Sequence, residues 1–277
     1  MTNVTPCFSH SVLNLGEPDR TGRPVWVLLH GFLGTAADWT AVLQAWARLG
    51  PCPARVWAPD LPGHGREPLG GVPSYASWTA WLDARLPARG PVVLVGYSLG
   101  GRVALAWAAR HAERVAALVL LAAHPGLVEP AARARRAAQD AARAARLRRQ
   151  GLRAFLEAWY RLPLFGLRWR PGLRAALVAR RARQDPAAMA AVVAGMSPGR
   201  QPPLWEALAR LAPRVVYVAG ARDSKYAALA RRLAGLRPAL MRIAIIEHAG
   251  HMLHLDAPHA VARLLREVHR ATTPRMG

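Results

Sequence analysis

The stretch GYSLG at residues 96–100 places Ser98 between two glycines. An apolar run, 91–96, precedes it, and an apolar helical pattern, 99–111, follows it. In such a strand-to-helix turn the glycines permit a tight bend and the serine hydroxyl projects above the sheet. The amides that open the helix favour negative charge beside it. The pattern therefore predicts a nucleophile elbow, and a turn that needs only small residues is the structural alternative.

A serine is a poor nucleophile or base alone, so a histidine and an orienting carboxylate must reach the same sheet edge. In a fold with this elbow, the acid follows a late strand and the histidine follows the last one. Asp223 comes shortly after the apolar run 214–220, and His251 comes after the run 241–247. We therefore predict a triad of Ser98, Asp223 and His251.

Other polar residues compete for these two roles. His248 lies so close to the strand end that we expect the sheet to hold it, and we expect His254 in the loop before the last helix. Asp256 directly precedes Ala-Pro, which predicts an N-cap for that helix. Asp60, in DLPGHG after an early strand, is expected to shape its own loop.

The loop His30-Gly31-Phe32 follows the first strong strand, 25–29. In this architecture that loop supplies one backbone amide for a developing oxyanion, and the residue after the nucleophile supplies the other. We predict an oxyanion hole made by the amides of Phe32 and Leu99. We expect His30 itself to be structural.

Short β-branched runs alternate along the chain with longer helical patterns. This alternation predicts an α/β fold, with a mostly parallel central sheet and helices on both of its faces. The alternation stops at 124–205, which is helical, rich in arginine and interrupted by prolines. We therefore expect residues 1–123 and 206–277 to form the core and 124–205 to be an inserted helical cap.

Composition limits the class of protein. A chain of 277 residues suits one catalytic domain with an insertion. The formal net charge is +22, but Lys225 is the only lysine, and no nucleic-acid motif accompanies the arginines. We expect no nucleic-acid partner. Cys7 and Cys52 are too few for a disulfide framework or a thiolate metal site, so we expect no metal.

From the sequence we expect neither a membrane span nor a secretory signal. No apolar run reaches the ~18 residues of a membrane span. Residues 1–24 do not show a basic stretch followed by an apolar one, as a secretory signal does. We expect a cytoplasmic protein without a membrane span.

The motifs LLHGFLG, DLPGHG, GYSLGGRVA, RDS and AGH together resemble the α/β-hydrolase superfamily over essentially the whole chain. Serine in the elbow argues against the dehalogenase and epoxide-hydrolase branches, which use aspartate there. A closer resemblance is to the MenH-type family of 2-succinyl-6-hydroxy-2,4-cyclohexadiene-1-carboxylate (SHCHC) synthases. It rests on GYSLGGRVAL, AHPGL (123–127), EAWYRLPLF (157–165) and GARDSKY (220–226).

This resemblance implies a carbon–oxygen lyase of menaquinone biosynthesis. Such an enzyme eliminates pyruvate from 2-succinyl-5-enolpyruvyl-6-hydroxy-3-cyclohexene-1-carboxylate. It further implies that the triad acts as a base, in which His251, oriented by Asp223 and coupled through Ser98, takes a proton next to the ketone. No acyl-enzyme, metal or organic cofactor is implied.

The implied substrate is a small polyanion with three carboxylates. A guanidinium group can donate two parallel hydrogen bonds to one carboxylate. The resemblance assigns this role to Arg102, Arg136 and Arg181. Arg102 lies four residues after Ser98, on the same side of a helix that we expect to be buried, so it needs a partner.

The two arginines in the cap have alternatives. Arg136 could instead pair with Asp140 at i+4. Arg133 or Arg135 could take its role, and Arg180 competes with Arg181. The resemblance also implies that three residues line the pocket, with ordinary packing of cap on core as the alternative: Tyr97, Trp159 and Phe165. His124, at the end of a strand that faces the site, is a further candidate.

Two other functions remain open from sequence. A serine carboxylesterase or C–C bond hydrolase would use the same triad and form an acyl-enzyme. A non-catalytic basic module on a hydrolase scaffold would bind polyanions without needing Ser98.

Overall fold

The computed structural model of the chain describes residues 22–165, 171–211, 214–235 and 241–273. Residues 1–21, with Cys7 and most of the segment considered for a secretory signal, lie outside the described part, as does the C-terminal end from 274.

A parallel sheet forms the centre of the molecule, with strand order β2-β1-β3-β4-β5-β6. Its central strands are apolar on both faces, because helices cover both sides of a parallel sheet. This confirms the predicted α/β fold. The strands are β1 (Val25–Leu29), β2 (Val56–Trp57), β3 (Val92–Tyr97), β4 (Val115–Leu121), β5 (Arg214–Gly220) and β6 (Met241–Ile246).

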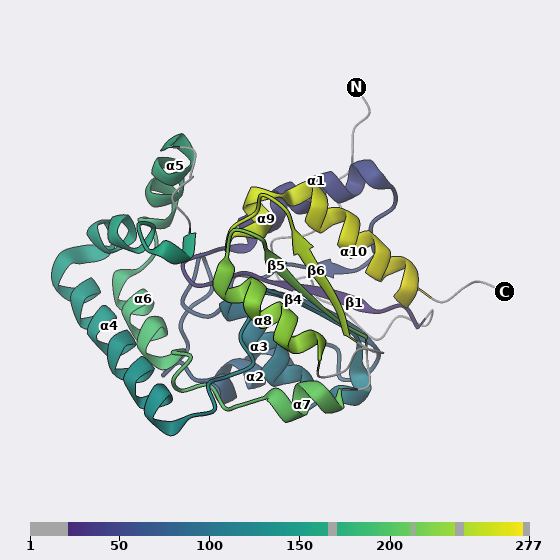
Figure 1. Ribbon diagram of the computed structural model, residues 1–277, viewed down its shortest axis with the longest axis horizontal. Helices are drawn as coiled ribbons and strands as arrows, with labels where there is room; N and C mark the ends of the chain where they lie inside the picture. The colour runs from purple at the N-terminus through teal and green to yellow at the C-terminus, as the bar shows by residue number, and fades with distance from the viewer. Residues whose placement is uncertain (1–21, 166–170, 212–213, 236–240, 274–277) are drawn as a thin grey trace.

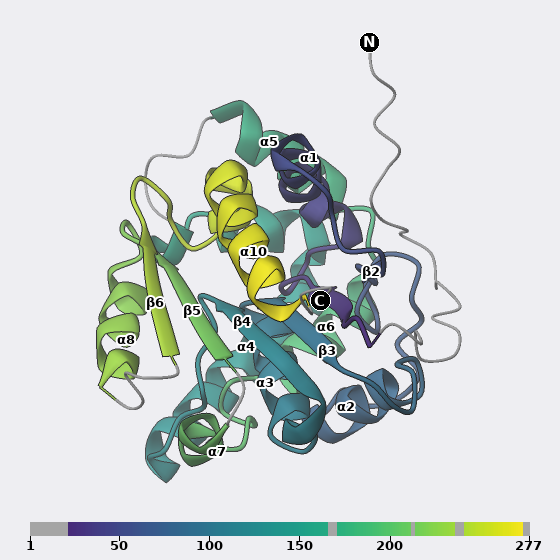
Figure 2. The same ribbon diagram turned by 90° about the vertical axis from the view of Figure 1, so that its right-hand side faces the viewer.

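Helices flank the sheet on both faces (Figures 1 and 2). On one side α1 packs against α10, and on the other lie α2, α3 and α8. Their bounds are α1 (Thr40–Leu49), α2 (Tyr75–Asp83), α3 (Leu99–Ala108), α8 (Ser224–Ala234) and α10 (Pro258–Thr272), with the short α9 (Leu253–Asp256) before the last.

The edge strand β2 is shorter than the sequence pattern predicts. Only Val56 and Trp57 pair with β1, whereas the pattern covers 55–59. Pro53 and Pro59 flank the strand, and proline cannot donate a ladder hydrogen bond. The prolines therefore leave only a short paired segment at this edge.

Between β4 and β5 the chain forms helices α4, α5, α6 and α7. Helices α4 and α6 pack against each other, and α4, α5 and α6 gather at one end of the sheet (Figure 1). Prolines start α4, α5 and α6, where a missing amide hydrogen costs nothing. The bounds are α4 (Pro130–Trp159, with a break at Gly151), α5 (Pro171–Arg181), α6 (Pro186–Gly195) and α7 (Trp205–Arg210).

The turn between β3 and α3 is strained. Ser98 has φ 49° and ψ −105°, in a region that L-residues avoid. Its N–H donates to the carbonyl of Leu121 at 2.9 Å, and its carbonyl accepts from the amide of Arg102 at 3.0 Å. The sheet and the first turn of α3 thus fix this backbone together.

Two buried histidines fasten the loop after β1 to the loop after β2. His30 Nε2 accepts from the amide of Leu61 at 2.9 Å, and His64 Nε2 accepts from the amide of Leu33 at 3.2 Å. Burial lowers the pKa of both histidines, so the neutral rings act as acceptors. His30 is therefore structural, as predicted, and it helps hold the loop that carries Phe32.

A third histidine, His254, is buried behind the site. Its ring lies 4.3 Å from that of Tyr97 and 5.4 Å from that of Trp39, centre to centre. Neither ring nitrogen has a hydrogen-bond partner among the described residues. Burial lowers the pKa of His254 to about 3, against the opposing charge of Asp38.

Gly100→Ala is expected to destabilise the protein by about 1–3 kcal/mol or more. An added Cβ would lie 2.3 Å from the carbonyl oxygen of Leu29, which is fixed in the sheet. Urea unfolding measures the loss. Gly172→Ala is the control, because a Cβ there meets nothing within 4 Å. Equal stability of the two variants would contradict the expected clash.

His254→Leu is expected to make stability less sensitive to acid. The folded pKa of His254 lies below the unfolded value of about 6.5, so only the unfolded chain takes up a proton between these values. The free energy of unfolding therefore falls as the pH decreases through this window, by up to about 1.4 kcal/mol per unit. Urea unfolding at several pH values measures the slope.

The control for this experiment is His259→Leu, which removes an exposed histidine of α10. If His254→Leu loses stability as steeply in acid as the wild type does, the buried neutral ring is not a source of the acid sensitivity.

Candidate active site

Three side chains from three loops meet at the carboxyl edge of the sheet. His251 Nδ1 lies 2.7 Å from Asp223 Oδ2, and His251 Nε2 lies 3.3 Å from Ser98 Oγ. With its proton on Nδ1, the imidazole donates to Asp223, and Nε2 can accept from the serine hydroxyl. The structure thus brings together the three residues predicted as the triad.

Hydrogen bonds donated by backbone amides hold the two loops that carry the acid and the base. Asp223 follows β5, and the neighbouring amide of Arg222 donates to the carbonyl of Ala249 at 2.9 Å. Asp256 Oδ2 accepts from the amide of Gly250 at 2.9 Å, next to His251. These bonds fix the histidine loop relative to the loop of its acid.

Aromatic rings surround the imidazole of His251, which is almost fully buried. The rings of Tyr226, Tyr97 and Phe165 lie 4.8, 5.4 and 5.9 Å from it, centre to centre. Such packing restricts the ring to an orientation that reaches both partners and keeps water from the Asp223 contact.

The amides of Phe32 and Leu99 follow β1 and open α3, respectively. Within the described residues neither amide donates to a backbone or side-chain acceptor. Both residues line the same cavity as Ser98. Unused amides beside a serine can stabilise an oxyanion.

The triad opens into a cavity with about 770 Å³ of empty space, including its opening to solvent. Of the predicted pocket residues, those that line the cavity are Tyr97, Arg102, Arg136, Trp159, Phe165 and Arg181.

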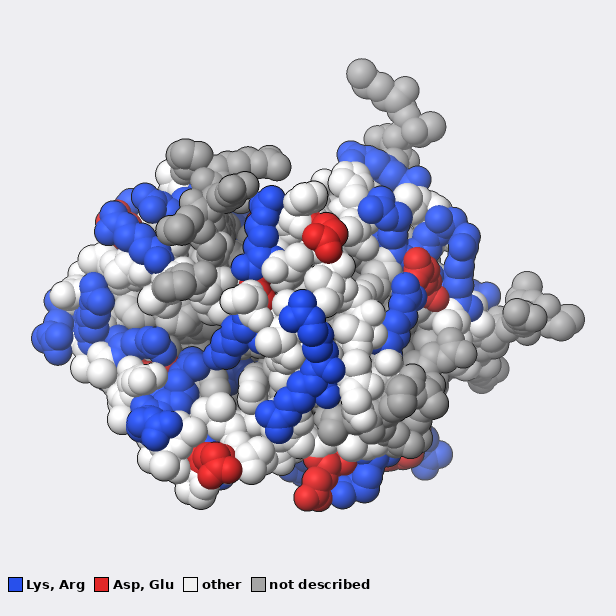
Figure 3. Space-filling view, viewed as in Figure 1, with Lys and Arg blue, Asp and Glu red and all other residues white. Residues whose placement is uncertain are grey.

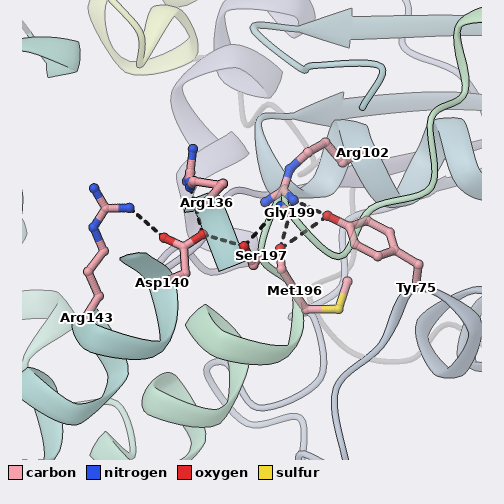
Figure 4. Close-up of polar contacts among 8 residues, drawn as sticks. All are labelled: Tyr75, Arg102, Arg136, Asp140, Arg143, Met196, Ser197 and Gly199. Carbon is pink, nitrogen blue, oxygen red and sulfur yellow. Dashed lines mark hydrogen bonds and ion pairs between the residues drawn. The ribbon is translucent and has the colours of Figure 1, made fainter. Parts of the chain in front are cut away.

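Arg102 is buried in α3 and its guanidinium has neutral partners. Nη1 donates to the carbonyl of Met196 at 2.8 Å and to the hydroxyl of Tyr75 (Figure 4). Tyr75 also donates to Met196 O at 3.2 Å, and burial raises its pKa to about 12, so it stays neutral. No ion pair to Arg102 occurs in the described ranges, so no carboxylate there compensates its positive charge at the wall of the cavity.

Arg136 pairs with Asp140 one turn further along α4, with Nε 2.8 Å from Oδ2. Arg143 also pairs with this buried carboxylate, at 2.5 Å, and Ser197 Oγ donates to it at 2.6 Å (Figure 4). The alternative pairing considered from sequence is therefore present. Arg136 nevertheless lines the cavity, while its neighbour Arg133 is near the carbonyl of Gly199.

Arg181 pairs with Asp38, at 2.9 Å between Nη2 and Oδ2, and donates to the hydroxyl of Tyr160. Arg180 pairs with the other oxygen of Asp38. Burial favours the neutral carboxyl, but the charge of Arg181 and its neighbours lowers the pKa of Asp38 overall. Of the two candidate arginines, only Arg181 lines the cavity.

Several residues of the site were not predicted from sequence. Lys225 and Tyr226 line the cavity, on the first turn of α8. Their position directly after Asp223 in GARDSKY was an available signal. Asp38 and Tyr75 had no sequence signal, because they meet arginines far away in the chain.

Three expectations about individual residues are wrong. His124 does not line the cavity, because its Nδ1 accepts from the amide of Gly126 and its ring packs on Trp205. His248 is not held in the sheet, since β6 ends at Ile246 and His248 is exposed in a turn.

The third is Asp256, which is not the cap of the last helix. Its carboxylate supports the His251 loop instead, and Ala257 occupies the N-cap position of α10. Asp60 does shape its loop, since it accepts from the amides of Ala36 and Arg66 at 2.8 and 3.0 Å.

The described residues offer neither a metal site nor a membrane span. No cluster of histidine, cysteine, aspartate and glutamate there could hold a metal ion. No helix in the same ranges is both long and apolar enough to cross a membrane.

Comparison with known proteins gives several close relatives. The SHCHC synthase of Salmonella agona is 36% identical over 255 residues, which cover 91% of this chain and 96% of the relative. The SHCHC synthase of Klebsiella pneumoniae is 34% identical over 258 residues, covering 91% and 95%. The chloroplastic protein PHYLLO of Arabidopsis thaliana is 30% identical over 289 residues, but the chain spans only 17% of its length.

Solved structures show the same similarity. MenH from S. aureus superposes with a TM-score of 0.83 at 27% identity, covering 93% of this chain and 97% of that one. A thermophilic esterase from Thermogutta terrifontis, solved with malate bound, has a TM-score of 0.73 at 26% identity and covers 92% of both chains. A sequence model of the alpha/beta hydrolase family matches residues 26–264. The chain therefore belongs to the alpha/beta hydrolase family.

Proposed function

We propose that the protein is an SHCHC synthase of menaquinone biosynthesis, a carbon–oxygen lyase. It would eliminate pyruvate from 2-succinyl-5-enolpyruvyl-6-hydroxy-3-cyclohexene-1-carboxylate. The observation that carries this proposal is a Ser98-His251-Asp223 hydrogen-bond chain that opens into a cavity lined by cationic side chains. The similarity to SHCHC synthases over most of the chain supports it.

The proposed chemistry is a base-promoted elimination. His251, oriented by Asp223 and coupled through Ser98, takes the proton from ring carbon 2, which the adjacent succinyl ketone acidifies. The electron pair forms a dienolate, the ring double bond shifts, and the bond between carbon 5 and the enolpyruvyl oxygen breaks. The departing enolpyruvate takes up a proton and becomes pyruvate.

The protein has groups suited to each charge in this reaction. The unused amides of Phe32 and Leu99 are placed to stabilise the enolate oxygen. Arg102, which has no carboxylate partner among the described residues, is suited to a substrate carboxylate in the cavity that Ser98 also lines. Basic side chains are also spread over the molecular face in Figure 3 and outnumber acidic ones, so the surface field attracts a polyanion.

A carboxylesterase is the second candidate, because the same triad and amides suit acyl transfer and a solved esterase has the same fold. The two functions differ in their products. Purified protein supplied with the enolpyruvyl substrate should release pyruvate, which lactate dehydrogenase detects. No pyruvate, together with burst turnover of p-nitrophenyl esters, would identify an esterase.

His251→Asn is expected to lower kcat/KM for pyruvate release by about 10²–10⁴-fold, because the base is lost. The matched control is His248→Asn, which removes an exposed histidine three residues away. Asparagine tolerates the positive φ of that residue, 63°. Full activity of His251→Asn, or an equal loss in the control, would show that His251 is not the base.

Arg102→Met is expected to cost about 2–4 kcal/mol of transition-state stabilisation, roughly a 30- to 1000-fold loss of kcat/KM. The reason is the loss of a charge-assisted contact to a substrate carboxylate. Arg110→Met, which removes an exposed arginine just beyond α3, is the control. If the Arg102 variant keeps near-normal kcat/KM while folded, as circular dichroism reports, Arg102 does not bind the substrate.

A further inference from the structure

Lys225 is the only lysine of the chain, although lysine and arginine together number 38. Its exposed side chain lines the cavity that contains Ser98 and His251. A compact ammonium group with three donors differs chemically from the planar guanidinium that this chain uses elsewhere. The position that carries it is the wall of the candidate active site.

The cations around the cavity differ in how far the protein already neutralises them. Arg136 and Arg181 each pair with a buried carboxylate, and Arg102 donates to neutral oxygens. Within the described residues Lys225 has no hydrogen bond or ion pair, and its Nζ lies 5.6 Å from the centre of the Tyr226 ring. The ammonium group therefore keeps all three donors available for a ligand.

The protein around Lys225 disfavours a positive charge there. The residue lies in the first turn of α8, where the helix dipole opposes a cation. Loss of hydration and then the charge of Arg136 lower its pKa, with Asp223 opposing. An anion bound at Nζ would offset the helix dipole and the charge of Arg136.

We propose that the Lys225 ammonium group binds a carboxylate of the substrate at the mouth of the cavity, and thereby selects polyanionic substrates. This inference rests on the proposed function. Arg102 belongs to α3 and Lys225 to α8, so two cations on separate elements can hold two carboxylates of one molecule. A substrate with two carboxylates is bound more tightly by two such contacts than by one.

Steady-state kinetics of pyruvate release test this role. Lys225→Met keeps much of the side-chain length without the charge, and should raise KM roughly 10- to 100-fold. Its kcat should change much less, because the group binds substrate without moving a proton. Lys225→Arg should restore most of the affinity. The control is Arg231→Met, which removes an exposed cation from the same helix and should leave KM unchanged.

A second measurement does not depend on turnover. Reductive methylation with ¹³C-formaldehyde labels Lys225 and the N-terminal amine while keeping their charge, so the lysine gives a single resolved NMR signal. Titration with tricarballylate, a tricarboxylate, should shift the Lys225 signal, and its uncharged trimethyl ester should not. The signal of the N-terminal amine is the internal control.

The outcomes separate the two proposals. An unchanged KM in Lys225→Met, or a Lys225 NMR signal that does not shift when tricarballylate is added, would overturn the substrate-binding role. A responsive signal in a protein that releases no pyruvate would support a carboxylate site at Lys225 and overturn the lyase function.

Discussion

The site depends on one strained backbone, that of Ser98. A φ of 49° costs roughly 1–3 kcal/mol, and it persists because its N–H belongs to the pairing of β3 with β4 and its carbonyl to the first turn of α3. The tight turn also brings α3 against the carbonyl of Leu29, which leaves room only for a hydrogen at Gly100. Once the serine is fixed above the sheet edge, the loops after β5 and β6 need only short connections to bring Asp223 and His251 to it.

A second constraint acts on the charged side chains around the cavity: burying an ion without a partner is energetically costly. The arginines around the cavity find their partners in two different ways. Arg136 and Arg181 are positioned by Asp140 and Asp38, so their guanidinium groups are oriented before any ligand arrives. Arg102 is satisfied by neutral oxygens and retains its full charge. The cavity is therefore less positive than its count of arginines suggests.

The sequence predicts those parts of the site that local patterns specify. The elbow at Ser98 and the positions of Asp223 and His251 after successive strands follow from short motifs and from parallel-sheet geometry. Contacts between distant segments leave no such pattern: Arg181 meets Asp38 across 143 residues, and Arg102 meets Met196 across 94. The same limit explains the errors at single residues, since His248 and His124 depend on where a strand ends and which loop packs beside it.

The hydrogen bond from Arg102 to the carbonyl of Met196 links helix α6 to the cavity that contains Ser98. Met196 caps the C-terminal end of α6, so its carbonyl belongs to the negative pole of that helix. A displacement of α6 would take from the guanidinium one of its two acceptors and the favourable dipole. The electrostatic potential that Arg102 contributes to the cavity is thus coupled to the position of α6.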